Sequence, residues 1–168
     1  ENGSLAMMAA TSKETFDEQQ DVLKGVGEKI FHVGEEIVMG QTVKAALQAL
    51  IGSTFTAIFE SLVLGAKAGV RGEVMHEVFG ASGVGSPLLK NCSKLIMDRA
   101  FKGTGSQIQT MYKDLGISMD MAKQNGVAMF TTSAAYELFQ SGISLFPDED
   151  NWSIVRLLEQ IADTEVKW

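Results

Sequence analysis

The sequence lacks the residues that several kinds of site require. Its single cysteine, Cys92, has no second thiol with which to form a disulfide or a thiolate metal site. The two histidines, His32 and His76, show no metal-ligand spacing with Cys, Asp or Glu, so we expect structural roles for both and no metal site. The absence of a disulfide framework is typical of a reducing, cytoplasmic compartment.

Long runs of one residue type are also missing. The 14 Lys and Arg residues form no run, and the net charge of −7 is spread along the chain, which argues against nucleic-acid binding. No apolar run approaches the roughly 18 residues that cross a bilayer, and no charged–apolar–small pattern marks a secretory signal. We therefore expect neither a nucleic-acid partner nor a membrane partner.

The residues that are present indicate a packed protein. Apolar residues make up 45% of the chain, and 168 residues suit one domain, or one domain plus a fragment of another. The chain begins ENGSLAMMAATSKETFDEQQ, without an initiating methionine or a leader, and enters an apolar segment at once. This start predicts a cut through a longer protein.

The first 34 residues predict a strand–helix–strand unit. Residues 4–11 are a short apolar run typical of a buried strand, and residues 29–34 alternate with β-branched and aromatic side chains. Between them, Ser12 can cap a helix whose first turns are acidic, and Gly25 or Gly27 can end it. Such a unit is too small to bury its own faces, which fits a missing partner segment.

After Gly40 the pattern becomes helical. From Gln41 to Gly69 apolar residues recur mostly in steps of three or four, which predicts a long central helix that is apolar over more than one face. The residues in these steps are Val43, Leu47, Leu50, Ile51, Phe55, Ile58, Leu62 and Val63. Further helical segments follow at 72–83, 86–101, 106–126, 129–144 and 147–166, and Asp148 to Asn151 can cap the last of them.

Lys44 is the first candidate for chemistry. It lies among apolar neighbours and, if the helix begins near Gln41 or Thr42, in a first turn where the dipole disfavours a cation. Burial and the dipole would both lower a lysine pKa and make it a usable general acid or base. Gln48, one turn on, shares its face and can orient Lys44 or bond a ligand hydroxyl. The alternative, a lysine reaching water from an exposed edge, is favoured by the residues alone.

Two further motifs have structural explanations. Lys113 and Asp114 in YKDLG are adjacent, so they point about 100° apart on a helix, and a solvated face explains them. The glycines of GASGVGS (80–86) follow a helix and lack a Gly-Lys-Ser/Thr ending, so neither phosphate-loop fingerprint fits. A helix terminator followed by a helix with Ser86 as its cap and Pro87 at its first position explains them better.

The order of motifs resembles the β-hydroxyacid dehydrogenases, the 3-hydroxyisobutyrate dehydrogenase family with its threonate dehydrogenase-like branch. GQTVKAALQALIGSTFTAIFESLVLGAKAGV resembles the family's interdomain helix, with matches at Gly40, Lys44, Glu60 and Gly69. YKDLGISMDMAKQNGV resembles its second signature, and DNWSIVRLLE its C-terminal helix. The first 34 residues resemble the last strands and helix of the preceding nucleotide-binding domain. The resemblance covers essentially the whole chain.

The resemblance implies roles for four residues. Lys44 matches the catalytic lysine, which exchanges a proton with the substrate hydroxyl while a hydride moves to or from nicotinamide. Lys113 matches a lysine that contacts the cofactor near its nicotinamide end. Gln48 falls where most members have a substrate-holding Asn, which hints at a sugar-acid substrate. Ser86 lies near the small-residue stretch that borders the substrate.

Two other positions depart from the family pattern. Leu47 replaces the first of the two Asn residues that follow the lysine. Val38 stands where the first Gly before the helix is expected, which could reshape the loop at that point. The replacement at Gln48, which the threonate dehydrogenase-like branch tolerates, puts 3-hydroxyisobutyrate itself in doubt as the substrate.

The resemblance also implies the architecture. Residues 1–38 would be the remnant of a Rossmann-type NAD(P)-binding domain. Residues 39–168 would be an all-helical domain like the C-terminal domain of 6-phosphogluconate dehydrogenase, so the fold is mainly α after a small β-α-β piece. Because the Gly-x-Gly-x-x-Gly segment is not here, we expect NAD or NADP to bind the complete enzyme and not to bind this chain tightly.

Two hypotheses about function follow. In the first, the chain is the C-terminal part of an NAD(P)-dependent dehydrogenase of a small 3-hydroxy or sugar acid, and it self-associates through the helical domain. In the second, it is a non-catalytic oligomerisation module derived from that family. Lys44 and Lys113 favour the first, since a scaffold has no physical need for a lysine in an apolar first turn.

Overall fold

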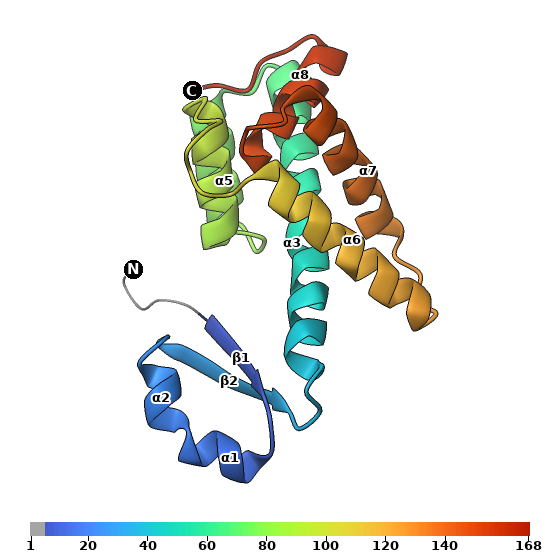
Figure 1. The fold of residues 1–168 in the computed structure, drawn as a ribbon. Coiled ribbons are helices and arrows are strands. Elements are labelled where there is room, and N and C mark those ends of the chain that lie inside the picture. Colours follow the sequence, from blue (N-terminus) through green and yellow to red (C-terminus); the bar gives the residue numbers. More distant parts are fainter. Residues whose placement is uncertain (1–5) are drawn as a thin grey trace. The chain divides into compact units, whose positions relative to one another are not determined.

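The computed structural model describes residues 6–168. These residues fall into two compact units, which divide between Gln48 and Ala49. Figure 1 shows the chain as a ribbon with its elements labelled. The fold is mostly helical with one small parallel sheet. We describe each unit by itself.

The first unit contains the strand–helix–strand arrangement. β1 (Ala6–Ala10) and β2 (Lys29–Gly34) pair in parallel, with Met8 opposite Phe31 in the register. The helices α1 (Lys13–Glu18) and α2 (Gln20–Lys24) connect the strands and lie along one side of them (Figure 1). The predicted strand at 4–11 is confirmed over Ala6–Ala10, and its residues 4 and 5 lie outside the described part of the chain.

One buried ring anchors this unit. Phe16 on α1 is 8% exposed and lies against the His32 ring of β2, with ring centroids 4.7 Å apart. The His32 Nε2 atom lies 2.7 Å from the carbonyl oxygen of Thr11, so the histidine ties β2 to the end of β1. His32 therefore has the structural contacts expected of it.

The helix of this unit differs in one respect from the prediction. Ser12 caps α1 as expected, since its Oγ accepts the Thr15 N–H at 3.2 Å. The single predicted helix is divided at Gln19, whose non-helical backbone ends α1 and precedes α2. α2 then ends at Gly25, one of the two predicted stops.

The long helix α3 (Met39–Lys67) begins two residues earlier than the expected Gln41. Its start needs a glycine, because a Cβ on Gly40 would lie 2.8 Å from the carbonyl oxygen of Met8 on β1. That distance is shorter than real Cβ contacts allow, so Gly40 lets the first turn of α3 approach the sheet.

The second unit is all helical over its described residues. It contains the rest of α3 and the helices α4 (Gly72–Ala81), α5 (Pro87–Met97), α6 (Ile108–Gln124), α7 (Phe130–Leu145) and α8 (Val155–Ala162), with a 3-10 turn at Asn151–Ile154 before α8. α6 and α7 run side by side as a hairpin, and α4 packs on α5 (Figure 1). These helices lie in the segments predicted as helical, except that α7 extends one residue past the predicted end at 144. The last helix, α8, is shorter than the predicted segment 147–166.

The core of this unit surrounds one face of α3. Phe59 and Leu62 of α3 are fully buried, and so are Leu115 of α6 and Phe139 of α7. The Phe55 ring meets the Trp152 indole edge to face, with centroids 5.3 Å apart. The core therefore packs its helices against α3, as expected of a central helix.

The helix α3 is long and apolar enough to cross a membrane by length and composition, although the sequence contains no unbroken apolar run of that length. The helix has 29 residues, and its most apolar 18-residue window has a mean hydropathy of 1.6. Of that window, 44% is buried inside the fold. The core helix of a packed protein meets the same criterion, and the buried face of α3 accounts for its apolar character.

Asp150 does not cap α8 with its side chain, contrary to the expected role of Asp148 to Asn151. Its carboxylate instead accepts hydrogen bonds from the backbone N–H and the hydroxyl of Thr104, at 2.7 and 2.8 Å. Trp152 Nε1 donates to the same Thr104 hydroxyl at 2.8 Å. Asp150 is 2% exposed, so these contacts fasten the loop before α6 to the start of the last helix.

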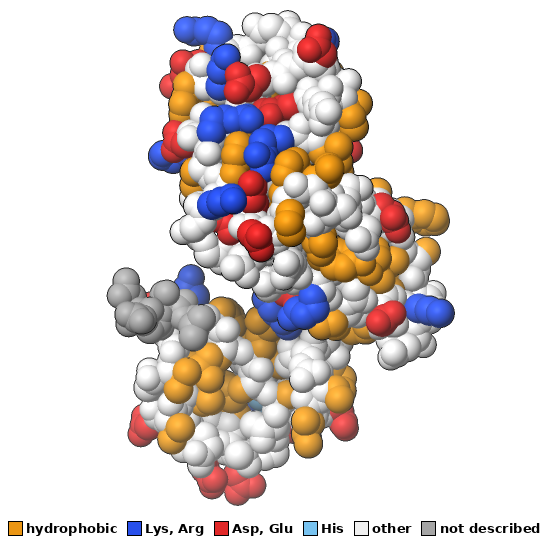
Figure 2. Space-filling model, turned by 45° about the horizontal axis from the view of Figure 1, so that its top comes forward, with side chains coloured by type: hydrophobic (Ala, Val, Ile, Leu, Met, Phe, Trp, Pro, Cys, Tyr) orange, Lys and Arg blue, Asp and Glu red, His pale blue; other side chains and the backbone are white. Residues whose placement is uncertain are grey.

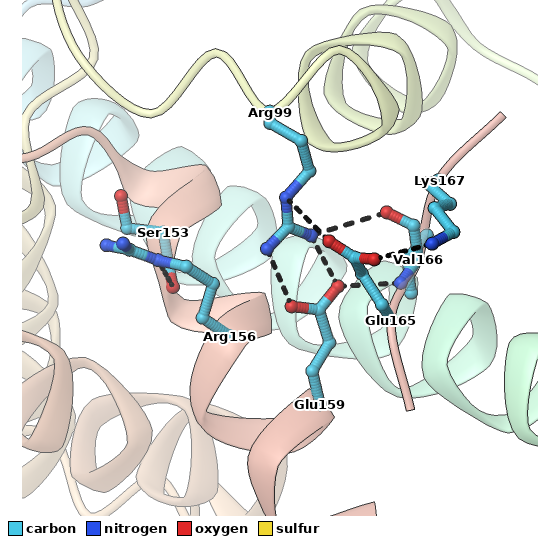
Figure 3. A network of polar contacts seen from close by, with 7 residues as sticks. All are labelled: Arg99, Ser153, Arg156, Glu159, Glu165, Val166 and Lys167. Atoms are coloured by element: carbon cyan, nitrogen blue, oxygen red, sulfur yellow. Dashed lines mark hydrogen bonds and ion pairs between the residues drawn. The ribbon is translucent and has the colours of Figure 1, made fainter. Parts of the chain in front are cut away.

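Arg99, which follows α5, is joined to Glu159 of α8 and to the C-terminal segment (Figure 3). Arg99 donates to both carboxylate oxygens of Glu159, at 2.6 and 3.0 Å, and to the Val166 carbonyl at 3.3 Å. The Val166 N–H donates to Glu159 at 2.7 Å, and Glu159 is 5% exposed. One buried carboxylate thus holds the residue after α5 and the C-terminal segment together.

The surface carries charges of both signs. On the face drawn in Figure 2, Lys and Arg side chains of the helical unit are interspersed with Asp and Glu, and hydrophobic side chains lie between them. The Lys94 and Asp98 pair, one helical turn apart on α5, is one such contact. Hydrogen bonds from Lys94 and from Trp168 hold the pKa of Asp98 below its ordinary value of 3.8.

We expect Arg99→Ala to lower the free energy of unfolding by about 3 kcal/mol, because it leaves the buried Glu159 carboxylate without its guanidinium. The matched control is Lys167→Ala in the same C-terminal segment. Its pair with Glu165 joins side chains that are 65% and 48% exposed, so the urea midpoint should hardly move. Urea unfolding followed by circular dichroism measures both, and equal midpoints for the two variants would contradict this account of the network.

Candidate functional site

Lys44 does not lie in the surroundings that its sequence neighbours suggested. Because α3 begins at Met39, Lys44 is its sixth residue and lies beyond the first turn. Its side chain is exposed, and so are its neighbours Val43 and Leu47, each 38% exposed. Of the two alternatives, the exposed lysine that the residues alone favoured is confirmed, and the partly buried lysine opposed by the helix dipole is wrong. The helix distributes the apolar neighbours around its circumference.

Gln48 lies one turn after Lys44 on the same helix face. Residues four apart on a helix are neighbours, so α3 brings the two side chains together. Gln48 is 7% exposed, whereas Lys44 is exposed. The pair therefore combines an exposed lysine with a buried amide. The amide can hold a hydroxyl-bearing ligand, and the lysine can exchange a proton with it.

Lys113 lies on α6 and forms an ion pair that the sequence did not predict. Its Nζ is 2.8 Å from the neighbouring Asp114 carboxylate, although adjacent helix residues point in different directions. The lysine side chain is flexible and 65% exposed, whereas the Asp114 side chain is 14% exposed. The ammonium group is thus accessible to a ligand, and it is oriented by a partly buried acid.

A chain of hydroxyl groups lies beside Lys113. Tyr136 of α7 donates to the hydroxyl of Tyr112 at 2.9 Å, and Tyr112 donates to the side-chain oxygen of Gln140. The two rings stack with centroids 4.7 Å apart. The hydrogen bond with Tyr112 raises the pKa of Tyr136 above its ordinary 10.0. No local pattern in the sequence predicts this contact, because 24 residues separate the two tyrosines.

Ser86 has the structural role that the sequence predicted. It precedes α5, and its Oγ accepts the Leu89 N–H at 3.2 Å, with Pro87 in the first helical position. The serine hydroxyl uses an oxygen lone pair in this cap. Its own proton remains available for a hydrogen bond to a ligand.

The four predicted residues lie in two groups. Lys44 and Gln48 belong to the first unit, and Ser86 and Lys113 to the second. His76 has a structural contact instead, with its Nδ1 atom 2.8 Å from the Ser93 hydroxyl. Among residues 6–168 no group of three or more His, Cys, Asp or Glu is placed to hold a metal ion.

Comparisons with known proteins identify the class. A crystal structure of 3-hydroxyisobutyrate dehydrogenase from Salmonella typhimurium superposes with a TM-score of 0.84 at 26% identity, over 92% of this chain and 54% of that one. The fold is therefore that of part of a hydroxyacid dehydrogenase. Residues 39–158 match the family described as NAD-binding of NADP-dependent 3-hydroxyisobutyrate dehydrogenase, and the chain belongs to that family.

Curated relatives agree with this family. The chain is 32% identical to 2-(hydroxymethyl)glutarate dehydrogenase of Eubacterium barkeri, over 99% of this chain and 55% of the relative. It is 29% identical to L-threonate dehydrogenase of Haemophilus influenzae, over 95% of this chain and 53% of the relative. The chain thus spans about half the length of the curated relatives it matches.

We expect Ser86→Ala to lower the free energy of unfolding by about 1 kcal/mol, because the first N–H groups of α5 lose their cap. Ser86→Asp keeps an acceptor at the same position and should restore most of the loss. Thermal unfolding of the three proteins tests the assignment. If Ser86→Ala were as stable as the unchanged protein, the capping role would be refuted.

Proposed function

We propose that this chain is the catalytic C-terminal part of an NAD(P)-dependent dehydrogenase that acts on a small hydroxy acid. The observation that carries the proposal is the family match over residues 39–158, which includes α3 and Lys44. An accessible lysine beside a fixed amide is what proton exchange with a substrate hydroxyl requires. A purely structural helix has no need of this pair.

Lys44 is the proposed proton-transfer residue. Its flexible four-carbon side chain is exposed, so the ammonium group can reach a bound substrate from the first third of α3. In oxidation the neutral Lys44 amine takes the proton from the substrate hydroxyl and becomes an ammonium group. In reduction that ammonium group gives a proton to the carbonyl oxygen and returns to the amine. Gln48, fixed by its burial, donates to or accepts from a second oxygen and thereby orients the substrate.

NAD(P), when bound, accepts or supplies the hydride. The residues of this chain fit such a group in one respect: the Lys113 ammonium is 65% exposed and can donate to a polar group of the cofactor. Asp114 holds that lysine in place, and Ser86 keeps a hydroxyl proton for the substrate side. We assign Lys113 to cofactor binding and Ser86 to the substrate border.

We propose a domain boundary at residue 38, where the sheet has ended and α3 has not yet begun, although the first compact unit extends to Gln48. The two paired strands and two short helices bury few side chains. Phe16 is the largest side chain in β1, α1, α2 and β2 that is less than one-tenth exposed. A sheet of this kind needs further strands to be stable, and the relatives are almost twice as long as the chain. We propose that residues 1–38 complete a nucleotide-binding domain and that residues 39–168 form a helical domain like that of 6-phosphogluconate dehydrogenase.

The substrate class and setting follow from the same match. A 3-hydroxy acid or sugar acid is the proposed substrate, since one relative is named for L-threonate and another for 2-(hydroxymethyl)glutarate. The buried Gln48 offers both a donor and an acceptor to such a polyhydroxy chain. We propose a cytoplasmic enzyme that self-associates through its helical domain, with tight NAD(P) binding only in the complete protein.

We expect Lys44→Ala, in the complete enzyme, to lower kcat by about 100- to 10,000-fold, the usual contribution of a general acid–base group. NAD(P) affinity should stay within about twofold, because Lys44 is not assigned to the cofactor. Steady-state kinetics and a fluorescence titration of the reduced cofactor measure the two effects. The control is Lys67→Ala near the other end of α3, which should leave kcat unchanged. Wild-type turnover by Lys44→Ala would remove Lys44 from the mechanism.

A further inference from the structure

Leu47 is an exposed apolar residue beside the two residues proposed to hold the substrate. It follows Lys44 by three residues on α3, and Gln48 follows Lys44 by four. Residues three and four apart on a helix are neighbours, so both side chains lie next to Lys44. Leu47 is 38% exposed. An apolar side chain therefore meets solvent within one turn of the proposed proton-transfer group.

Leu47 and Gln48 lie on opposite sides of Lys44. Leu47 is rotated by about 60° from Lys44 around the helix axis in one direction, and Gln48 by about 40° in the other. The rise along the axis from Lys44 is about 4.5 Å to Leu47 and about 6 Å to Gln48. The three side chains thus form a triangle whose corners are an amine, an apolar group and an amide.

The sheet of the first unit covers this helix face before Lys44. Gly40 precedes Lys44 by four residues and Leu47 by seven, so the three positions share one face of α3. The carbonyl oxygen of Met8 on β1 lies 2.8 Å from the place that a Cβ of Gly40 would take. Beyond this backbone contact, the triangle of Lys44, Leu47 and Gln48 is the first part of the face that a ligand can reach.

Val43 extends the apolar corner of the triangle. It precedes Leu47 by four residues, so the two side chains are neighbours, and each is 38% exposed. A hydrocarbon group placed on them gains about fourfold in affinity for each methylene group that leaves water. A hydroxyl group placed there loses water and finds no hydrogen-bond partner on either side chain.

We propose that Leu47 is a specificity-determining residue and that the substrate is a 3-hydroxy acid whose second carbon carries an alkyl branch. The hydroxyl group lies at Lys44, the carboxylate lies at the Gln48 amide, and the branch lies on Leu47 and Val43. The three substituents of such an acid match the three corners of the triangle. This inference rests on the proposed function and narrows its substrate class.

A polyhydroxy acid matches the same three corners less well. Every carbon of L-threonate outside its carboxylate carries a hydroxyl group, so any part of it that lies on Leu47 brings a hydroxyl group there. An apolar surface rejects an added hydroxyl group by at most about 100-fold, so we expect a preference for the branched acid. 2-(Hydroxymethyl)glutarate has such an alkyl branch, and the relative named for it is 32% identical to this chain.

The first test compares acids in the complete protein. The measured quantity is the ratio of kcat/KM for the better of two branched acids, 3-hydroxyisobutyrate and 2-(hydroxymethyl)glutarate, to kcat/KM for L-threonate. We expect the unchanged protein to favour the branched acid, and Leu47→Asn to lower the ratio by about 10- to 100-fold, because the new amide can bond a hydroxyl group. The fraction of folded protein cancels in this ratio.

Two variants are the controls. Leu47→Met keeps an apolar side chain of similar volume, so the ratio should stay within about twofold. Ala46→Asn places the same amide on the same turn, about 200° around the helix from Lys44. Ala46 is exposed, so this variant should remain folded and keep the ratio of the unchanged protein.

The second test does not depend on turnover. With the reduced cofactor present, the hydroxy acid cannot be oxidised, so its complex with the complete protein can be studied by saturation-transfer NMR. Irradiation of the protein methyl groups should saturate the branch protons of the acid more than the protons of its hydroxyl-bearing carbon. Leu47→Asn should remove this difference, and Ala46→Asn should keep it.

The outcomes separate this inference from the proposed function. A preference of the unchanged protein for L-threonate, an unchanged ratio in Leu47→Asn, or equal saturation of the two sets of protons would overturn the role of Leu47 and leave the dehydrogenase assignment standing. Absence of turnover with all three acids would overturn the proposed function, and this inference with it.

Discussion

Close packing around α3 is the constraint on which the helical unit depends. A Cβ on Gly52 would lie 2.7 Å from a side-chain carbon of Leu115, so only glycine lets α6 approach α3 at this point. Leu115 is fully buried there and fixes the helix that carries Lys113. The position of Lys113, the predicted cofactor contact, therefore depends on the absence of a side chain at Gly52 of α3.

Much of the fold could be predicted because its signals are local. Ser12 and Ser86 cap the helices that follow them, as their positions before acidic or proline-led turns indicated. The period of the apolar residues located the helices, since one buried face per helix produces that period. Non-local contacts have no such signal. Arg99 meets Glu159 across 60 residues, and no pattern in the sequence links the two.

The candidate site shows the same division. The helix that places Gln48 one turn after Lys44 could be predicted, because their spacing alone determines that they are neighbours. The exposure of Lys44 could not, because apolar neighbours in sequence spread around a helix and do not enclose one another. The Lys113–Asp114 ion pair was missed for a related reason, since a long flexible side chain can reach a neighbour that its Cβ does not face.

The chain belongs to the 3-hydroxyisobutyrate dehydrogenase family, and we propose from that membership the roles of Lys44, Gln48 and Lys113. The most direct measurement combines the complete protein with NAD or NADP and a series of hydroxy acids that includes L-threonate, 3-hydroxyisobutyrate and 2-(hydroxymethyl)glutarate. Absorbance of the reduced nicotinamide reports hydride transfer. The account predicts turnover of at least one of these acids with one of the two cofactors. A correctly folded complete protein that reduces neither cofactor with any of them would contradict it.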